Sequence, residues 1–221
     1  MITVHHLENS RSQRVLWLLE ELRLPYEVQR YARDKKTSLA PPELAAVHPL
    51  GKSPVITDGK VTVAETGAIV EYLVEQAGDA LRPTPGSAEH RRYTYWLHFA
   101  EGSAMPPLVM ALVFNRIKTA PMPFFARPIA KAIADNVLDS FVKPNIAAQL
   151  DFMEAELAQH AWFTGRAFTA ADVMMSFPLE AAAAARQIGA RPNLNAFLER
   201  IHERPAYRRA LERGGPFTLG L

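Results

Sequence analysis

The stretch from His48 to Thr66 constrains the fold more than any other part of the chain. Two short β-branched runs flank Asp58-Gly59, a pattern that predicts a β-hairpin. Pro54 stands immediately before the first run, and because proline donates no backbone hydrogen bond, it belongs at the start or edge of a strand. Glu65-Thr66 then opens a helical pattern, and the free N–H groups of a helix start can hold an anion. The stretch therefore predicts a proline-marked strand, a hairpin and an anion-holding helix start.

The residues around this stretch predict a complete small α/β domain. The expected elements before it are a strand at 2–6, a helix with Val15, Leu18, Leu19 and Leu22 on one face, and a strand at 26–31. A β-α-β unit of this length implies parallel strands with a right-handed crossover. Residues 34–47 favour a loop with one short helical piece around 43–46. The resulting order, β-α-β-α-β-β-α, is typical of a thioredoxin-like domain.

The remainder of the chain predicts an all-helical bundle, so the fold class is α/β plus all-α. A segment rich in proline and glycine near residues 80–87 is the expected linker, which gives domains at 1–80 and 88–221. We expect Pro106-Pro107 to bend or interrupt the first long helix, and Pro144 to kink a later one. Between these helices, residues 119–128 predict an irregular apolar loop.

A local capping pattern occurs late in the chain. Thr169 precedes an apolar helical run, and Asp172 lies three residues further on, which is the spacing of a capping box. We expect Asp172 to have this structural role and not to act as a catalytic acid.

Composition excludes several classes of function. The 221 residues carry a formal net charge of +2 without a basic block, which gives no electrostatic case for binding nucleic acid or a membrane surface. No cysteine is present, so a disulfide and a cysteine nucleophile are excluded, and any reacting thiol must come from a ligand. His5 and His6 are adjacent on a strand and face opposite sides, so no metal site is expected. With no secretory leader or long apolar span evident, the expectation is a soluble cytoplasmic protein.

The stretch from His48 to Thr66 resembles the glutathione-binding half of the glutathione S-transferase family, of the cytosolic, bacterial-like type. In that family a cis-proline follows a Gly-Lys-X sequence, matched here by Lys52, Ser53 and Pro54. The resemblance implies that the Ser53 backbone pairs with the cysteinyl part of glutathione, although valine or isoleucine is more usual at this position. It also implies that Glu65 and Thr66 hold the γ-glutamyl group. Lys52 and His48 are then candidates for the glycyl carboxylate.

The resemblance further implies that the protein activates the thiol of glutathione, its co-substrate. Asn9, Ser10 and Ser12 precede the first helix and offer donors to a thiolate, and the helix start adds its dipole. Ser10 lies four residues before Arg14, a spacing similar to that of family members that use serine, so Ser10 ranks first and Asn9 second. No tyrosine lies between His6 and Arg14, which argues against the tyrosine type. For Arg14 an interdomain ion pair is expected, whereas Arg11 is a candidate for contact with the ligand's carboxylates.

By the same resemblance, the first long helix lines a pocket for a hydrophobic electrophile. The candidates there are Tyr93, Trp96, Met105 and Phe114, although aromatic residues at helical spacing more often belong to the core, and the loop at 121–125 is a candidate cover. The expected activity is conjugation of the thiolate to such electrophiles. Two alternatives stay open, namely glutathione-dependent reduction of peroxides or disulfides, and non-catalytic binding of hydrophobic ligands. The resemblance also implies a homodimer, in which the hairpin and the helix that begins near Glu65 contact the partner's helical domain.

Overall fold

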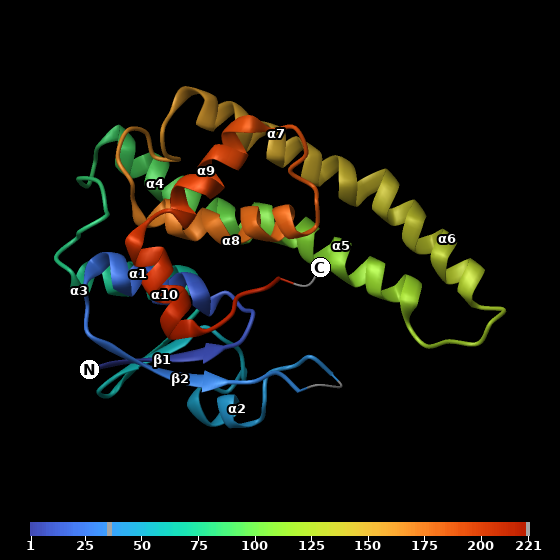
Figure 1. Ribbon diagram of the computed structural model, residues 1–221, viewed down its shortest axis with the longest axis horizontal. Helices are drawn as coiled ribbons and strands as arrows, with labels where there is room; N and C mark the ends of the chain where they lie inside the picture. The colour runs from blue at the N-terminus through green and yellow to red at the C-terminus, as the bar shows by residue number, and fades with distance from the viewer. Residues whose placement is uncertain (35–36, 220–221) are drawn as a thin grey trace.

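The computed structural model describes residues 1–34 and 37–219, and its first part is a four-stranded sheet with helices on both faces (Figure 1). Its elements are β1 (Ile2–Leu7), α1 (Ser12–Leu22), β2 (Tyr26–Tyr31), α2 (Glu43–Val47), β3 (Val55–Asp58), β4 (Val61–Ala64) and α3 (Thr66–Gln76). This order confirms the thioredoxin-like domain, including the short helix inside the loop before the hairpin.

The sheet has the strand order β2-β1-β3-β4, with β1 parallel to β2 and the other neighbours antiparallel. The parallel pair confirms the expected crossover through α1. Central pairs such as Val4 with Ile56 are fully buried, because α1 and α3 cover this face of the sheet. In Figure 1, α2 lies beyond the opposite face. The carboxyl end of β1 and the start of α1 thereby meet the segment that enters β3.

The rest of the chain is helical. Its elements are α4 (Ala88–Phe99), η1 (Ala100–Ala104), α5 (Met105–Thr119), α6 (Arg127–Val137), η2 (Leu138–Val142), α7 (Lys143–Gln159), α8 (Ala170–Ala184), α9 (Pro192–His202) and α10 (Pro205–Gly214). The proposed linker residues lie between α3 and α4. The last helix, α10, packs against α1 and β2, so the end of the chain returns to the N-terminal domain (Figure 1).

The expectation that Pro106-Pro107 bend or interrupt the first long helix is wrong for the interruption, because the helix continues across them. The helix continues from Ala88 to Thr119 because the π-helical turn η1 lies immediately before the prolines, which occupy the first turn of α5. Pro144 occupies the same position in α7, directly after the π-helical turn η2. A proline lacks the N–H and crowds the carbonyl four residues earlier, and a wider turn relieves both constraints.

Asp172 has the structural role that the sequence predicts. Its carboxylate accepts hydrogen bonds from the backbone N–H groups of Thr169, at 2.8 Å, and Phe163, at 2.9 Å. Burial raises the pKa of Asp172 to about 7, and these hydrogen bonds act in the opposite direction. The side chain therefore ties the turn before α8 to the start of that helix.

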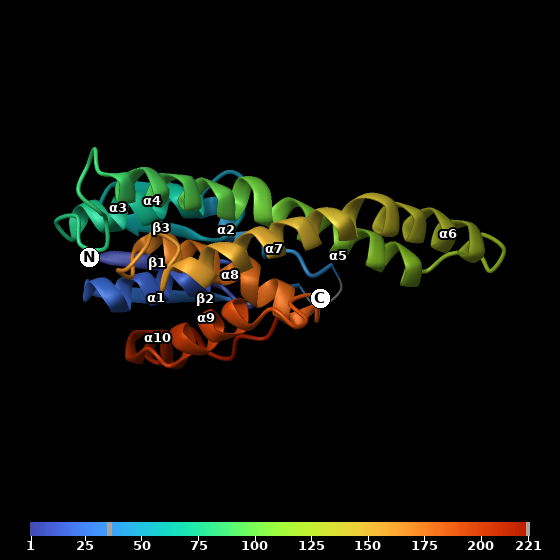
Figure 2. The same cartoon turned by 90° about the horizontal axis from the view of Figure 1, so that it is seen from above.

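One long helix passes through the core of the helical domain and then leaves it. Of the described residues, only the helix Ala88–Thr119 has the length and hydropathy of a membrane-crossing segment. Its first half buries Tyr93, Trp96 and Leu97 in the core of the protein. Its second half, α5, pairs with α6, and the two form an arm that projects beyond the body of the molecule (Figures 1 and 2).

Candidate functional site

A cavity of about 220 Å³ lies where the segment before β3, the start of α3, the start of α1 and the π-helical turn η1 meet. Its lining residues are Arg11, His48, Leu50, Lys52, Ser53, Pro54, Ala64, Glu65, Thr66 and Glu101. All six residues that the resemblance assigns to glutathione binding thus face one cavity. Cationic and anionic side chains both line it, as a ligand with carboxylates and an ammonium group requires.

The peptide bond between Ser53 and Pro54 is cis, as the resemblance implies. The Ser53 hydroxyl donates to the His5 carbonyl, at 2.9 Å, and accepts from the Leu7 N–H, at 3.3 Å. These bonds fasten the segment to β1 in line with the antiparallel register of β1 and β3. Serine is therefore accommodated in place of valine or isoleucine because its side chain bonds to β1, which leaves its backbone at the cavity.

The start of α3 forms another wall. Glu65 adopts φ +70° and ψ 126°, a conformation that non-glycine residues rarely take and that costs about 1–3 kcal/mol. Its side chain makes no capping bond to the helix and is exposed, whereas Thr66 is buried. Glu65 and Thr66 line the cavity at the start of α3, where the first N–H groups of the helix have no intrahelical partner. This corner can hold an ammonium group and a carboxylate at once.

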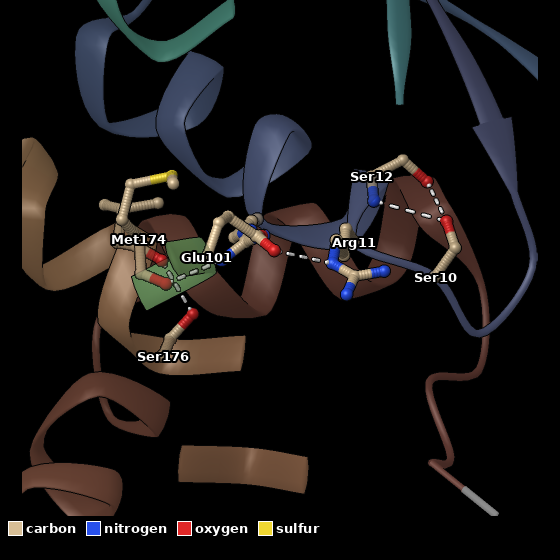
Figure 3. Close-up of polar contacts among 8 residues, drawn as sticks. Ser10, Arg11, Ser12, Glu101, Met174 and Ser176 are labelled. Atoms are coloured by element: carbon tan, nitrogen blue, oxygen red, sulfur yellow. Dashed lines mark hydrogen bonds and ion pairs between the residues drawn. The ribbon is translucent and has the colours of Figure 1, made fainter. Parts of the chain in front are cut away.

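An ion cluster joins the two domains at the edge of the cavity (Figure 3). Glu101, in η1, accepts from the Arg11 Nε at 3.1 Å and forms an ion pair with Arg14. Arg14 is almost fully buried and also donates to the Met174 carbonyl, at 2.6 Å. The interdomain ion pair expected for Arg14 is thereby confirmed. Arg11 lines the cavity, and its guanidinium lies 5.4 Å from the centre of the Phe177 ring.

The two serines between β1 and α1 belong to a chain of buried hydrogen bonds. Ser10 Oγ lies 2.7 Å from Ser12 Oγ, which lies 2.9 Å from His6 Nδ1 (Figure 3 shows the serines). Ser12 Oγ also lies 3.3 Å from the Leu7 carbonyl oxygen, so the Ser12 hydroxyl has two buried acceptors within reach, that oxygen and His6 Nδ1. Ser10 Oγ accepts from the Ser12 N–H, at 3.2 Å. Burial, with a smaller effect from Arg30, lowers the pKa of His6 to about 4 and keeps the ring neutral.

Asn9 lies one residue earlier and is exposed, with φ +49°. Its side-chain oxygen accepts a hydrogen bond from the Thr218 N–H, at 2.8 Å. The amide nitrogen takes no part in this bond. Ser12 is fully buried and Ser10 nearly so. None of the three lines the cavity as Arg11 does, although all lie on the turn that contains Arg11.

The four residues expected to line an electrophile pocket do not meet at this cavity. Tyr93, Trp96 and Met105 are buried in the core, and Phe114 is half-buried on α5. Trp96 packs against Phe152 and Phe163 instead. The loop at 121–125 lies at the end of the projecting arm (Figure 2). Helical spacing in the sequence shows that these side chains share faces, but it does not show which face meets the cavity.

Glu101 and His6 are the residues that the sequence analysis missed. Glu101 is an isolated acid between the apolar parts of a long helix, close to two prolines, and that isolation was a usable signal. His6 gave none, because its role depends on Ser12 and on Gly214 at the far end of the chain. Among the described residues, no group of three histidine or acidic side chains is placed to hold a metal ion.

Comparison with known proteins agrees with this arrangement. Residues 1–75 match the glutathione S-transferase N-terminal domain, and residues 125–205 match the C-terminal domain of the same family. The chain is 37% identical to glutathione S-transferase 3 of Schizosaccharomyces pombe, over all of this chain and 91% of that protein. It is 34% identical to glutathione S-transferase 1 of Saccharomyces cerevisiae, over 82% of this chain and 81% of the relative.

Solved structures show the same likeness. A glutathione S-transferase from Actinobacillus pleuropneumoniae superposes with a TM-score of 0.80 at 31% identity, covering 99% of this chain and 94% of that one. A family member from Pseudomonas fluorescens, solved with two glutathione molecules bound, gives a TM-score of 0.75 at 25% identity, covering 96% of this chain and 92% of that one. With the cis-proline, the strained Glu65 and both domains in place, the chain belongs to the glutathione S-transferase family of enzymes.

Proposed function

We propose that this enzyme conjugates the thiolate of glutathione to hydrophobic electrophiles, with glutathione bound in the cavity beside Pro54. The observation that carries the proposal is that several groups meet at this cavity. They are the backbone at the cis bond between Ser53 and Pro54, the carboxylate of Glu65 on its strained backbone, and the cationic side chains of Arg11 and Lys52. A tripeptide with an ammonium group and two carboxylates is complementary to such a lining.

The binding mode follows from the chemistry of each wall. Lys52 carries a positive charge and forms no ion pair among the described residues, so it is suited to the glycyl carboxylate, with His48 beside it. The Ser53 backbone pairs with the cysteinyl residue. Glu65 binds the γ-glutamyl ammonium group, while Thr66 and the free N–H groups of α3 bind its carboxylate.

For the thiol we propose Ser10 as donor, with Arg11 supplying positive potential. The Ser12 hydroxyl has buried acceptors in His6 Nδ1 and the Leu7 carbonyl, whereas the Ser10 hydroxyl has one side-chain neighbour within hydrogen-bond reach among the described residues, the Ser12 hydroxyl. A neutral hydrogen bond contributes about 1 kcal/mol, and a hydrogen bond to a charged group about 1.5–3 kcal/mol. The Ser10 hydroxyl therefore turns toward a thiolate and gains energy, but it gains little by turning toward a neutral thiol. This difference favours the charged form of the sulfur.

Two phenylalanine side chains near Arg11 are suited to contact the hydrophobic electrophile. Phe177 lies under the Arg11 guanidinium, and Phe217, on the tail after α10, lies 6.3 Å from Phe177 between ring centres. Both are on the helical-domain side of the turn that holds Ser10. We therefore assign the hydrophobic substrate to this side, because Arg11 contacts Phe177 and lines the cavity, whereas Tyr93 and Trp96 do not line it.

A panel of reactions tests the proposal against its two alternatives. The measurements are turnover of a simple aryl halide, an organic hydroperoxide and a small disulfide, each with glutathione, beside direct binding of glutathione. Aryl halide turnover that saturates with glutathione supports conjugation. Turnover of the hydroperoxide or disulfide alone assigns the site to reduction, and binding without any turnover assigns it to ligand carriage.

We also propose that the protein is a homodimer. Val61 on β4 is exposed, as are Tyr95 and Phe152, which lie beside each other on α4 and α7. The latter two, with Trp96, form the aromatic part of a depression of about 420 Å³, which Arg91, Arg92 and Glu156 also line. Light scattering at micromolar concentration tests this, and a mass of 24.6 kDa, that of one chain, would contradict it.

A further inference from the structure

The arm formed by α5 and α6 ends in apolar side chains that contact little of the protein. Both views show that the end of the arm lies beyond the body of the protein (Figures 1 and 2). There the loop between Thr119 and Arg127 joins α5 to α6. We call the following residues the arm tip, with their exposed fractions: Ile117, 38%; Phe124, 82%; Phe125, 66%; Ile129, 63%; Ile133, 59%. Clustered exposure of this kind marks an interaction surface, whereas single exposed apolar residues do not.

The helix that leads away from the tip is amphipathic in a particular way. Ile129 and Ile133 lie one turn apart on one side of α6, and Arg127 and Lys131 lie one turn apart on nearly the opposite side. Ala134, which is buried, points between them toward the protein. An apolar side with adjacent phenylalanines and a basic side opposite it is the pattern of a helix that lies in a membrane interface.

The charge around the tip is strongly one-sided. Residues 114–136 contain four basic side chains and a single acid, Asp135, which pairs with Lys118 at 2.7 Å. Their formal charge of +3 exceeds the +2 of the whole chain, so the remainder of the protein is close to neutral. The rest of a second copy therefore offers the tip almost no net negative charge, whereas an anionic lipid surface is negative throughout.

The shape of the tip also suits a fluid surface. Phe124 and Phe125 occupy the outermost turn of a convex hairpin, and their rings pack on each other with centres 5.7 Å apart. A convex end has little area to offer a rigid partner, but it can enter the headgroup region of a bilayer to a depth of about 5–10 Å. The body of the protein, being set back from the tip, does not obstruct that approach.

We propose that the arm tip docks reversibly on the surface of anionic lipid bilayers, with the two phenylalanines inserted and Arg127 and Lys131 near the headgroups. This departs from the expectation drawn from whole-chain charge, because the basic residues are concentrated in one tenth of the sequence. The proposal is independent of the reaction at the cavity.

The test is vesicle flotation of the full chain, with vesicles of phosphatidylcholine alone or mixed with phosphatidylserine. The wild type is expected to float with the mixed vesicles, less so at high salt, and at least tenfold more weakly with phosphatidylcholine alone. The double variant Phe124→Ser/Phe125→Ser and the double variant Arg127→Gln/Lys131→Gln should each lose at least tenfold in binding. Leu39→Ser, which removes an equally exposed apolar side chain from the N-terminal domain, is the matched control and should bind normally.

Two further measurements on the same variants keep the result interpretable. Thermal melting and glutathione binding should be unchanged in all of them, because the altered side chains are exposed and far from the cavity. Absent flotation of the wild type, or equal flotation of the wild type and the phenylalanine variant, would overturn the proposal. Conversion of a dimer to monomer by Phe124→Ser/Phe125→Ser, seen by light scattering, would also overturn it by showing that a second copy covers the tip.

Discussion

Substitution of Glu65 should weaken glutathione binding strongly while it changes the free energy of unfolding little. Glu65 lines the cavity through its side chain, holds a backbone conformation of φ +70°, and forms no ion pair among the described residues. Removing one partner of a desolvated charge pair costs about 2–5 kcal/mol. Because Glu65 is exposed without ligand, the lower end applies, and Glu65→Ala should weaken glutathione binding about 30-fold or more. Glu65→Gln should give a smaller loss.

Stability should behave differently in the same variants. Glu65→Ala leaves the strained backbone in place, so its free energy of unfolding should stay within about 0.5 kcal/mol of the wild type. Glu65→Gly removes the Cβ that makes positive φ unfavourable, so it should bind poorly yet unfold no more easily than Glu65→Ala.

Calorimetric titration with glutathione and urea unfolding measure the two quantities. Glu71→Ala, an exposed acid further along α3, is the control and should change neither. Glutathione affinity of Glu65→Ala within threefold of the wild type would refute the assignment of this wall.

The remaining predictions concern the ion cluster and the buried histidine. Glu101→Ala leaves the guanidinium of Arg14 buried beside the Met174 carbonyl and without its carboxylate, so the free energy of unfolding should fall by about 3 kcal/mol. Glu101→Gln should lower the free energy of unfolding less. Equal melting temperatures for the wild type and Glu101→Ala would contradict this. The folded-state pKa of His6, about 4, lies below its unfolded value of about 6.5, so the folded chain binds fewer protons between these values. Stability should therefore be lost as pH falls from 6.5 toward 4, by up to about 1.4 kcal/mol per unit from this residue. Urea unfolding at pH 7 and 5 measures this effect: the free energy of unfolding of the wild type should exceed that of His6→Gln by less at pH 5 than at pH 7. An equal difference at both pH values would argue against a buried neutral ring.

Local signals in the sequence were sufficient for the N-terminal domain. Pro54, Asp58-Gly59 and Glu65-Thr66 indicate a strand start, a hairpin and a helix start from a few adjacent residues, and the structure has all three at these positions. The cis bond before Pro54 was implied only by the family resemblance. The capping box at Thr169 and Asp172 was equally readable for the same reason. Where a feature depends on adjacent residues, the sequence predicts it directly.

Features that depend on distant segments were not readable. Arg11 and Glu101 are 90 residues apart and meet only because η1 lies against the start of α1. Helical spacing identified Tyr93 and Trp96 as one apolar face, but the packing of α7 and α8 decided that this face is core. The π-helical turns that precede the prolines were not predicted, because such a turn leaves no composition signal.

The measurement that tests the account most directly is the titration of glutathione bound to the enzyme, followed by thiolate absorbance against pH. A free thiol has a pKa near 8.5, and the bound thiol should titrate below the value of free glutathione because Ser10 donates preferentially to the charged form. Exchange of a neutral hydrogen bond of about 1 kcal/mol for a charge-assisted one of about 1.5–3 kcal/mol favours the thiolate by about 0.5–2 kcal/mol, so Ser10→Ala should raise the pKa of the bound thiol by about 0.5–1.5 units, with glutathione still bound. Asn9→Ala should leave the titration unmoved. A bound thiol that titrates like free glutathione, or a titration that moves in Asn9→Ala and not in Ser10→Ala, would contradict the account.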